Sequence, residues 1–410
     1  MRAVLVSVIL LPLFSLGCGM PKNKLNLHQR SMSIGNVTDE QKILGNASLE
    51  KVDPESNLRI VHLKGTPYEM GFQHGSLLKK EIQEFYGSVI FKIKFMIKED
   101  MLDETYDLID PYIPIEEKEE MRGLAHGAGV PLRVVHWVHT IPEISEYGPK
   151  KRFRRVFKET SCSNIAAFAD ATADGKMYHL RVLDWIRNLG AQRFPIVLVH
   201  VPDRGNSSAT FSYAGFIGAI SGMNDKQMTF GEMGYGDPPD ESLEGIPFIF
   251  LFRKLMRESN SLDDATRIIK EAKRTCSYIY LITDAKGADN SKKAVLFITD
   301  RGRVKVSTEN TDINDERDND SYPGIPRVVY GGAKAKPLYD GLSKHRGAIT
   351  PEILMEMTKG ISLGSNMQNV VFAPETLEAW VSNASLASGD KGKACNQKWF
   401  HVRLKDALKP

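Results

Sequence analysis

Cys162, Arg181 and Asp184 are the residues of this 410-residue sequence whose types and spacing could perform catalysis. A cysteine attacks a carbonyl carbon as the thiolate, so it needs a base within hydrogen-bonding reach and a cation or dipole nearby. If the bond between Ser161 and Cys162 is cut, the freed α-amine has an unperturbed pKa of roughly 8 and can accept the thiol proton. The chemistry that this predicts is attack on a carbonyl by an N-terminal cysteine.

A β-hairpin is predicted around these residues. The segment CSNIAAFADATADGKMYHLRVLDW indicates a strand from Cys162, a tight turn at Asp174-Gly175 and a return strand that ends at Asp184. The return strand would bring Arg181 and Asp184 beside the thiol. There Asp184 could orient the amine, and Arg181 could hold Asp184 or a substrate carboxylate. The alternative is that Cys162 is a small apolar strand residue, as most cysteines are.

Motifs in and around this hairpin resemble the N-terminal cysteine hydrolases of the penicillin acyltransferase type, which are related to bile-salt hydrolases and acid amidases. The hairpin carries the cysteine, a TxDG turn and R-x-x-D-W. The flanking motifs are GTPYEMGFQHG (Gly65 to Gly75), EEMRGLAHGAGVP (Glu119 to Pro131), ISGMNDKQMTFGEMG (Ile220 to Gly234) and GIPFIFLFRKLM. The resemblance implies an α/β fold of four layers (αββα), with two stacked antiparallel sheets and a mainly helical prosegment.

The resemblance also implies further site residues. Glu232 lies where acid-amidase relatives carry a Glu or Asn, and a carboxylate there would orient the α-amine. Asn224 lies on the hairpin from which the family builds part of its oxyanion site, although by its type it is first a turn residue. His74 and His179 are more simply explained as packing residues. The family's late oxyanion Asn and its Arg partner have no clear counterpart, since VVYGGAKAKPLYDG carries Lys334 and a second lysine.

The first residues predict an export signal and a lipid anchor. Met1-Arg2 precedes an apolar run, Ala3 to Leu16, that is shorter than the roughly 20 residues of a membrane-spanning helix and fits a signal peptide. The stretch Ser-Leu-Gly-Cys that ends at Cys18 resembles a bacterial lipobox, so Cys18 is the expected lipidated residue. A plain secretory signal is the alternative. The expected location is a membrane surface of the bacterial cell envelope.

These observations divide the chain into four parts. They are residues 1–18 as signal peptide with the anchor cysteine, 19–56 as a polar tether, 57–161 as a mainly helical prosegment, and 162–410 as the catalytic αββα domain. The tether range is rich in Asn, Ser and Lys and lacks a sustained hydrophobic period, which is typical of a linker. The fragments made by cleavage at Ser161|Cys162 are expected to stay associated.

Charge and cysteine content narrow the possible partners. Lys plus Arg number 54 and Asp plus Glu 51, and the resulting net charge of +3 is too balanced to indicate a nucleic-acid partner. Neither CxxC nor Cys/His spacing typical of a metal site occurs, so no metal and no cofactor are predicted. If Cys18 is lipidated, Cys276 and Cys395 could pair and leave Cys162 free.

The predicted function is hydrolysis or acyl transfer at a linear amide, through a thioester on Cys162 and after self-cleavage at Ser161|Cys162. The expected partner is a small-molecule or lipid-like acyl amide, with the membrane reached through the lipid anchor. One alternative is a phospholipase-B-like lipid deacylase, which a membrane tether makes plausible. Another is a non-catalytic surface lipoprotein on the same fold, and the retained CSN and RVLD motifs argue against it.

Overall fold

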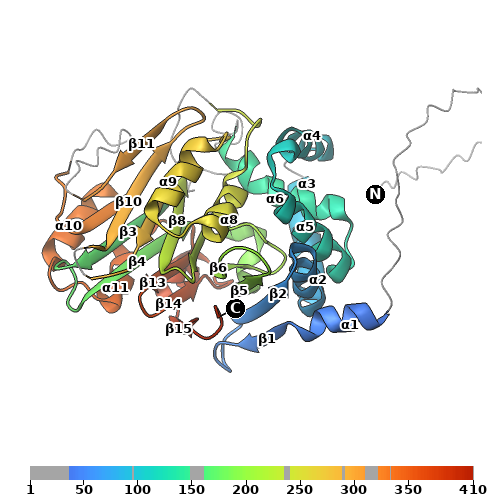
Figure 1. Cartoon of the computed structure of the whole chain (residues 1–410), viewed down its shortest axis with the longest axis horizontal. Helices are drawn as coiled ribbons and strands as arrows, with labels where there is room; N and C mark the ends of the chain where they lie inside the picture. Colours follow the sequence, from blue (N-terminus) through green and yellow to red (C-terminus); the bar gives the residue numbers. More distant parts are fainter. Residues whose placement is uncertain are drawn as a thin grey trace, which may run out of the picture. The chain divides into compact units, whose positions relative to one another are not determined.

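The computed structural model describes residues 37–94, 97–147, 161–234, 241–288, 291–309, 322–332 and 334–409 (Figure 1). Cys18 and the segment between Tyr147 and Ser161 lie outside the described residues. The chain divides into two compact units, Met1–Glu40 and Gln41–Pro410. The second unit contains both β-sheets, and the candidate site residues from Ser161 onward belong to it.

Two sheets form the centre of this unit. The nine-stranded sheet has the order β1 (Ser48–Lys51), β2 (Arg59–Gly65), β5 (Pro195–Pro202), β6 (Ser208–Tyr213), β7 (Ser221–Asn224), β8 (Met228–Gly234), β9 (Tyr278–Asp284), β10 (Lys293–Thr299), β11 (Val304–Ser307). The six-stranded sheet has the order β12 (Val328–Gly332), β3 (Ser161–Ala169), β4 (Gly175–Asp184), β13 (Asn366–Ala373), β14 (Glu378–Asn383), β15 (Phe400–Arg403). The predicted hairpin is confirmed as β3 and β4. Neighbouring strands are antiparallel, with one parallel pair, β2 and β5.

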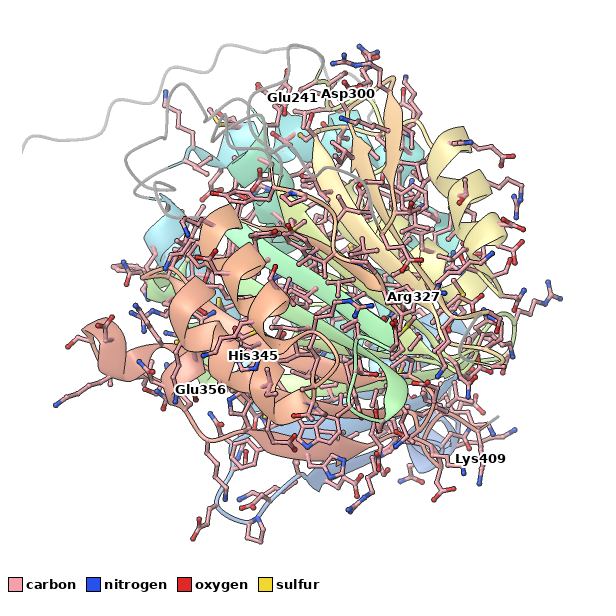
Figure 2. The ribbon with its side chains drawn as sticks, turned by 90° about the vertical axis from the view of Figure 1, so that its left-hand side faces the viewer. Glu241, Asp300, Arg327, His345, Glu356 and Lys409 are labelled. Carbon is pink, nitrogen blue, oxygen red and sulfur yellow. The ribbon has the colours of Figure 1, made fainter. Side chains whose placement is uncertain are left out.

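The sheets face one another, because β3 contacts β8 and β9, and β4 contacts β8. Helices α8 (Phe248–Glu258) and α9 (Leu262–Glu271) cover the outer face of the nine-stranded sheet, where the Phe252 ring packs on Tyr280 of β9 at 5.4 Å between ring centroids. Helices α10 (Ala335–His345) and α11 (Pro351–Ile361) cover the outer face of the six-stranded sheet (Figure 2). The predicted αββα arrangement is confirmed.

A helical region lies between β2 and Ser161. It consists of α2 (Pro67–Leu77), α3 (Lys79–Lys94), α4 (Glu99–Ile109), α5 (Ile115–Ala128) and α6 (Leu132–Glu146). Helix α2 begins with a capping box, in which Thr66 Oγ1 accepts from the Glu69 backbone N–H and the Glu69 carboxylate accepts from the Thr66 N–H at 2.8 Å. Helices α2 and α5 approach so closely that a Cβ atom at Gly123 would lie 2.0 Å from the Tyr68 carbonyl oxygen. Only glycine permits this contact.

Buried charges join this helical region to the chain that follows Cys162. Glu120 on α5 accepts from Arg253 Nη2 on α8 at 2.6 Å and lies 3.0 Å from His200 Nε2 on β5. All three side chains are buried. In addition, β2 pairs with β5 along its whole length. The region before Cys162 is therefore built into the same core as the region after it.

The range 19–56, predicted as a polar tether, contains secondary structure. Helix α1 (Val37–Gly45) and β1 occupy part of it, and β1 pairs with β2. A four-residue edge strand of mixed polarity gives no hydrophobic period to detect. Cys276 and Cys395, which the sequence allowed to pair, are both buried and form no disulfide. Among the described residues, no helix is both long and apolar enough to cross a bilayer.

Candidate active site

The start of β3 places Cys162 beside the end of β4. Its side chain is 7% exposed, and it lies opposite Leu183 in the hairpin register. Burial raises the pKa of the thiol to about 12, although the Arg181 guanidinium and the backbone N–H of Asp184, which donates to the sulfur, both favour the thiolate. The sulfur is therefore protonated at neutral pH, and a thiolate would form here only with the help of a base.

Arg181 on β4 lies opposite Asn164 in the register, on the side of β4 that faces the nine-stranded sheet. Its Nη2 donates to Oε2 of Glu232 on β8 at 3.3 Å, so this ion pair connects the two sheets. The side chains are 1% and 6% exposed. Within the described part of the chain, Nε and Nη1 of Arg181 have no hydrogen-bond partner. A buried guanidinium with open donors can bind an oxygen atom of a ligand.

Glu232 has an environment that favours its neutral form. Burial raises its pKa to about 8, with Glu146 at the end of α6 acting in the same direction, and Arg181 opposes the rise without cancelling it. Glu143 on α6 behaves alike, because burial raises its pKa to about 8 while the Thr275 hydroxyl donates to its Oε1. Burial thus favours the neutral form of both carboxyls, and at Glu232 the ion pair with Arg181 acts against it.

Asp184 has a different set of partners. Its Oδ1 accepts from Asn366 Nδ2 at 3.1 Å, the backbone N–H of Leu363 also donates to the carboxylate, and Oδ2 is buried with no partner among the described residues. Burial raises the pKa of Asp184 to about 6, while these donors and the charges of Arg181 and Lys334 hold it down. The sequence allowed Arg181 to hold either Asp184 or a substrate carboxylate. Arg181 does not hold Asp184, because residues three apart on a strand point to opposite faces.

Two of these neighbours were not identified as site residues from the sequence. Lys334 Nζ donates to the carbonyl oxygens of Gly360 and Ser362 at 3.0 and 2.9 Å, which places its charge near Asp184. Asn366 begins β13, the strand next to β4. In the sequence Asn366 is marked only by its place just before the apolar run NVVFA, and the structure adds that its side chain is fully buried.

Behind Arg181 a chain of buried polar groups fixes the sheet interface. Asn164 Nδ2 donates to the Glu232 carbonyl oxygen at 3.3 Å, and Asn164 Oδ1 lies 3.1 Å from His179 Nε2. Burial lowers the pKa of His179 to about 3, with Arg181 adding to the effect. The neutral ring therefore donates from Nε2 and accepts at Nδ1 from Thr229 Oγ1 at 2.7 Å. This is the packing role expected for His179.

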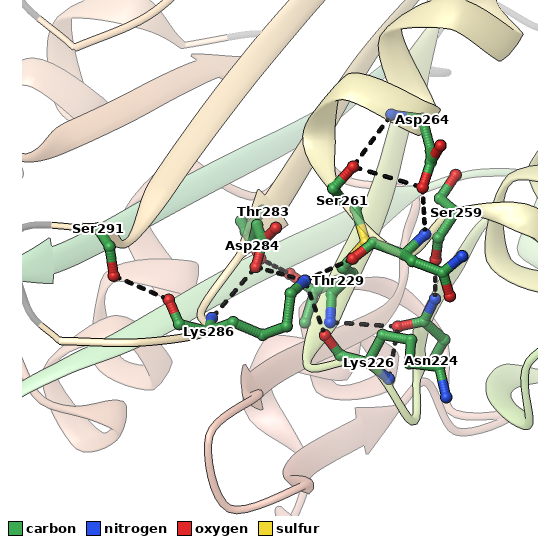
Figure 3. A network of polar contacts seen from close by, with 12 residues as sticks. Asn224, Lys226, Thr229, Ser259, Ser261, Asp264, Thr283, Asp284, Lys286 and Ser291 are labelled. Carbon is green, nitrogen blue, oxygen red and sulfur yellow. Dashed lines mark hydrogen bonds and ion pairs between the residues drawn. The ribbon is translucent and has the colours of Figure 1, made fainter.

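Asn224 is not brought together with these residues. Its Nδ2 donates to the carbonyl oxygens of Ser259 and Met256 at 2.9 and 3.1 Å (Figure 3). Its Oδ1 accepts from the backbone N–H groups of Lys226 and Met228, both at 3.2 Å. These contacts tie the turn between β7 and β8 to the end of α8 and use both amide hydrogens. The structure therefore assigns Asn224 to the turn and not to an oxyanion site.

Ser161 is the first residue of β3 and lies opposite Asp184 in the register. Within the described ranges, His, Cys, Asp and Glu side chains form no cluster of three or more that could hold a metal ion.

The groups that the structure brings together are the Cys162 sulfur, the Arg181–Glu232 pair and the Asp184 carboxyl with its donors.

Residues 174–316 match the sequence profile of the acyl-coenzyme A:6-aminopenicillanic acid acyl-transferase family. This segment contains Arg181, Asp184 and Glu232 and begins after Cys162. Among curated proteins, dcd1A of Dictyostelium discoideum is 31% identical over 262 residues, which cover 56% of this chain and 56% of that protein. Protein dcd1B of the same organism is 25% identical over 293 residues, 65% of this chain and 55% of that protein. The chain spans about half the length of these relatives.

Solved structures with a related arrangement include a Caenorhabditis elegans ortholog of N-acylethanolamine-hydrolyzing acid amidase. It has a TM-score of 0.40 and 11% identity and covers 59% of this chain and 100% of that one. The conjugated bile acid hydrolase of Clostridium perfringens has a TM-score of 0.38 and 9% identity. The match covers 59% of this chain and 96% of that one.

Proposed function

We propose that this protein is an amide hydrolase or acyltransferase whose nucleophile is the N-terminal cysteine produced by self-cleavage at Ser161|Cys162. The observation that carries the proposal is the convergence at the start of β3. The Cys162 sulfur accepts from the Asp184 backbone, Oδ2 of Asp184 is open, and Arg181 pairs with Glu232 on the facing sheet. The profile match over residues 174–316 supports acyl transfer as the reaction class.

Self-cleavage would begin with the Cys162 sulfur attacking the Ser161 carbonyl carbon. The C–N bond of the peptide breaks, a thioester forms, and the thiol proton ends on the Cys162 nitrogen. Water then attacks the thioester, so that Ser161 becomes a carboxylate and the sulfur regains its proton. In the uncut chain the pKa of the buried thiol is raised to about 12, and the α-amine that cleavage frees would supply the base for turnover.

In turnover the α-amine takes the thiol proton as the sulfur attacks the amide carbonyl, and the resulting ammonium passes a proton to the leaving amine. Water or a second amine then resolves the thioester. The open Oδ2 of Asp184 would accept a hydrogen bond from the ammonium form. The open donors of Arg181 would bind an acceptor oxygen of the substrate, with Glu232 holding the guanidinium in place.

The two fragments would remain one particle after cleavage. The buried contacts of Glu120 with Arg253 and His200, and the ladder between β2 and β5, support this because each joins residues on both sides of the cut. The substrate class we propose is a small-molecule or lipid-like acyl amide, encountered at a membrane to which a lipid on Cys18 anchors the chain.

Mass spectrometry of the purified protein tests the proposal. We expect two fragments, the larger beginning with Cys162, and labelling of Cys162 by a thiol-directed acyl probe. Cys162→Ala should stay uncut and unlabelled, whereas Cys276→Ala, which removes another buried cysteine, should behave like the parent. A chain that is active while uncut would exclude the α-amine as base. A protein that is neither cut nor labelled would support the non-catalytic alternative.

A further inference from the structure

The carboxyl group of Asp184 is held from one side by the turn between α11 and β13. Asn366 Nδ2 donates to Oδ1 at 3.1 Å, and the Leu363 N–H donates to the same carboxylate. Oδ2 is buried and has no partner among the described residues. One oxygen is thus fixed, and the other is available to a donor that is absent from the uncut chain.

A second contact agrees with this orientation of the Asn366 amide. The Cys395 backbone N–H, which can only donate, lies 2.8 Å from Asn366 Oδ1. With its oxygen toward Cys395, the amide nitrogen faces Asp184, and it also lies 2.8 Å from Asn369 Oδ1 and 3.3 Å from the Leu183 carbonyl oxygen. The Asn366 side chain is fully buried, so neither partner is replaced by solvent.

An irregularity in the sheet directs this side chain. Asn366 lies opposite Asp184 and Gln368 lies opposite Leu183, so Met367 is an additional residue in β13. Such a β-bulge bends the strand and re-aims the side chains next to it. The bulge falls at the one point of β13 that faces Asp184.

We propose that Asn366 is a positioning residue for the reaction, which holds Oδ1 of Asp184 so that Oδ2 faces the α-amine of Cys162 after cleavage. This inference rests on the proposed function, because that amine exists only in the cut protein. The role is separate from any contact with substrate, since Asn366 acts through Asp184.

The expected signature lies in the pH dependence of the sulfur. Burial raises the pKa of Asp184 to about 6, while the Leu363 N–H, the Asn366 amide and the charges of Arg181 and Lys334 act to lower it. Removing the Asn366 amide should raise that pKa further, so Asp184 would lose its charge at a higher pH as the solution is acidified. The reactivity of Cys162 should then fall at a higher pH than in the parent. A residue that only supports the fold would not move this inflection.

The test uses the cut protein and iodoacetamide, with the alkylation rate of Cys162 followed by peptide mass from pH 4 to pH 9. In Asn366→Ala and in the isosteric Asn366→Asp we expect the acid-side inflection to rise by about half a pH unit or more. Gln368→Ala is the matched control. This residue is buried in the same strand, and its amide donates to Asn383 Oδ1 at 3.0 Å. The acid-side inflection of the Gln368→Ala variant should therefore lie at the same pH as in the parent.

An acid-side inflection that is unchanged in both Asn366 variants would overturn the inference. Failure of both variants to fold would also overturn it, because it would show that Asn366 serves the fold. These outcomes differ from failure of the proposed function. That failure would appear in the parent protein, as an uncut chain or as an alkylation profile that Asp184→Asn leaves unchanged.

Discussion

Arg181 on β4 donates to Glu232 on the facing sheet at 3.3 Å, while Asp184, three residues further along the same strand, accepts from Asn366 on the neighbouring strand. The alternation of side chains along a strand explains the separation. The two charged residues of the R-x-x-D motif therefore have different partners and, in the proposed reaction, different roles. We propose that Arg181 binds the substrate and that Asp184 binds the α-amine of Cys162.

Conservative substitutions of these two residues should both be costly. Arg181→Lys replaces a planar fork by a single ammonium that cannot contact Glu232 and a ligand together, and Asp184→Asn removes the charge that would hold the ammonium form. For each we expect the rate of Cys162 acylation by a thiol-directed probe to fall about a hundredfold, roughly 3 kcal/mol, as for one lost electrostatic contact.

Arg133→Lys is the control for the arginine, because Arg133 is exposed and its ion pair with Asp103 lies on the surface of the helical region. Its acylation rate should match the parent within about twofold. If the Arg181 and Asp184 variants fold and also stay within that range, the constellation is structural and the site assignment is wrong.

The contact between Glu120 and Arg253 predicts how the fragments hold together. Arg253→Met should leave the Glu120 charge buried without its main partner, which costs about 3–5 kcal/mol of unfolding free energy. The cut parent should elute from size exclusion as one particle containing both fragments, and the cut variant should lose the smaller one. Lys254→Met, next in the same helix, changes a half-exposed side chain 3.9 Å from Glu258 and should cost at most about 1 kcal/mol. Equal stability of the two variants would contradict the prediction.

The hairpin could be predicted because its information is local. Cys162, the turn at Asp174-Gly175 and the return strand lie within one stretch of sequence, and strand alternation fixes which residues share a face. Asn366 could not be placed in the same way. It reaches Asp184 only because β13 pairs with β4 across 182 positions of sequence, and no local pattern specifies which distant strand becomes a neighbour.

Helices α6 and α10 depend more on tertiary packing than on their local sequence. Helix α6 contains Pro142 and several β-branched residues, and α10 contains a proline and a glycine, so their intrinsic propensity is poor. Packing stabilises them, as shown by the buried side chains of Trp137 on α6 and Leu338 on α10. The Arg181–Glu232 pair has a similar origin, since it depends on how two sheets stack and not on either strand alone.

Cys18 provides a prediction about location. Cys18→Ala should release the protein from membranes, because one lipidated residue would carry the whole anchor. Cell fractionation of parent and variant checks this, with far-ultraviolet circular dichroism to show that the fold persists. A variant that stays wholly with the membrane fraction would mean that another part of the chain binds the membrane.

The buried carboxyls predict how stability depends on pH. Burial raises the pKa of Glu143 and of Glu232 from an ordinary value of 4.5 to about 8. Between these values the folded state binds more protons than the unfolded state, so the free energy of unfolding falls as the pH rises. The buried histidines His74 and His139, with pKa values lowered to about 3 and about 4, act in the opposite sense, but only below their ordinary value of 6.5.

Between pH 7 and pH 8 the buried carboxyls should therefore determine the slope, and the free energy of unfolding should fall as the pH rises. Each group contributes up to about 1.4 kcal/mol per pH unit there. Glu143→Gln keeps the shape and the Oε1 acceptor for Thr275 but cannot ionise, so its stability curve should be flatter than that of the parent. Urea unfolding at half-unit steps from pH 6.5 to pH 8 measures the slopes. Glu119→Gln, a half-buried glutamate paired with Arg122, should leave the slope unchanged. Parallel curves for the parent and Glu143→Gln would show that Glu143 is ionised throughout this range.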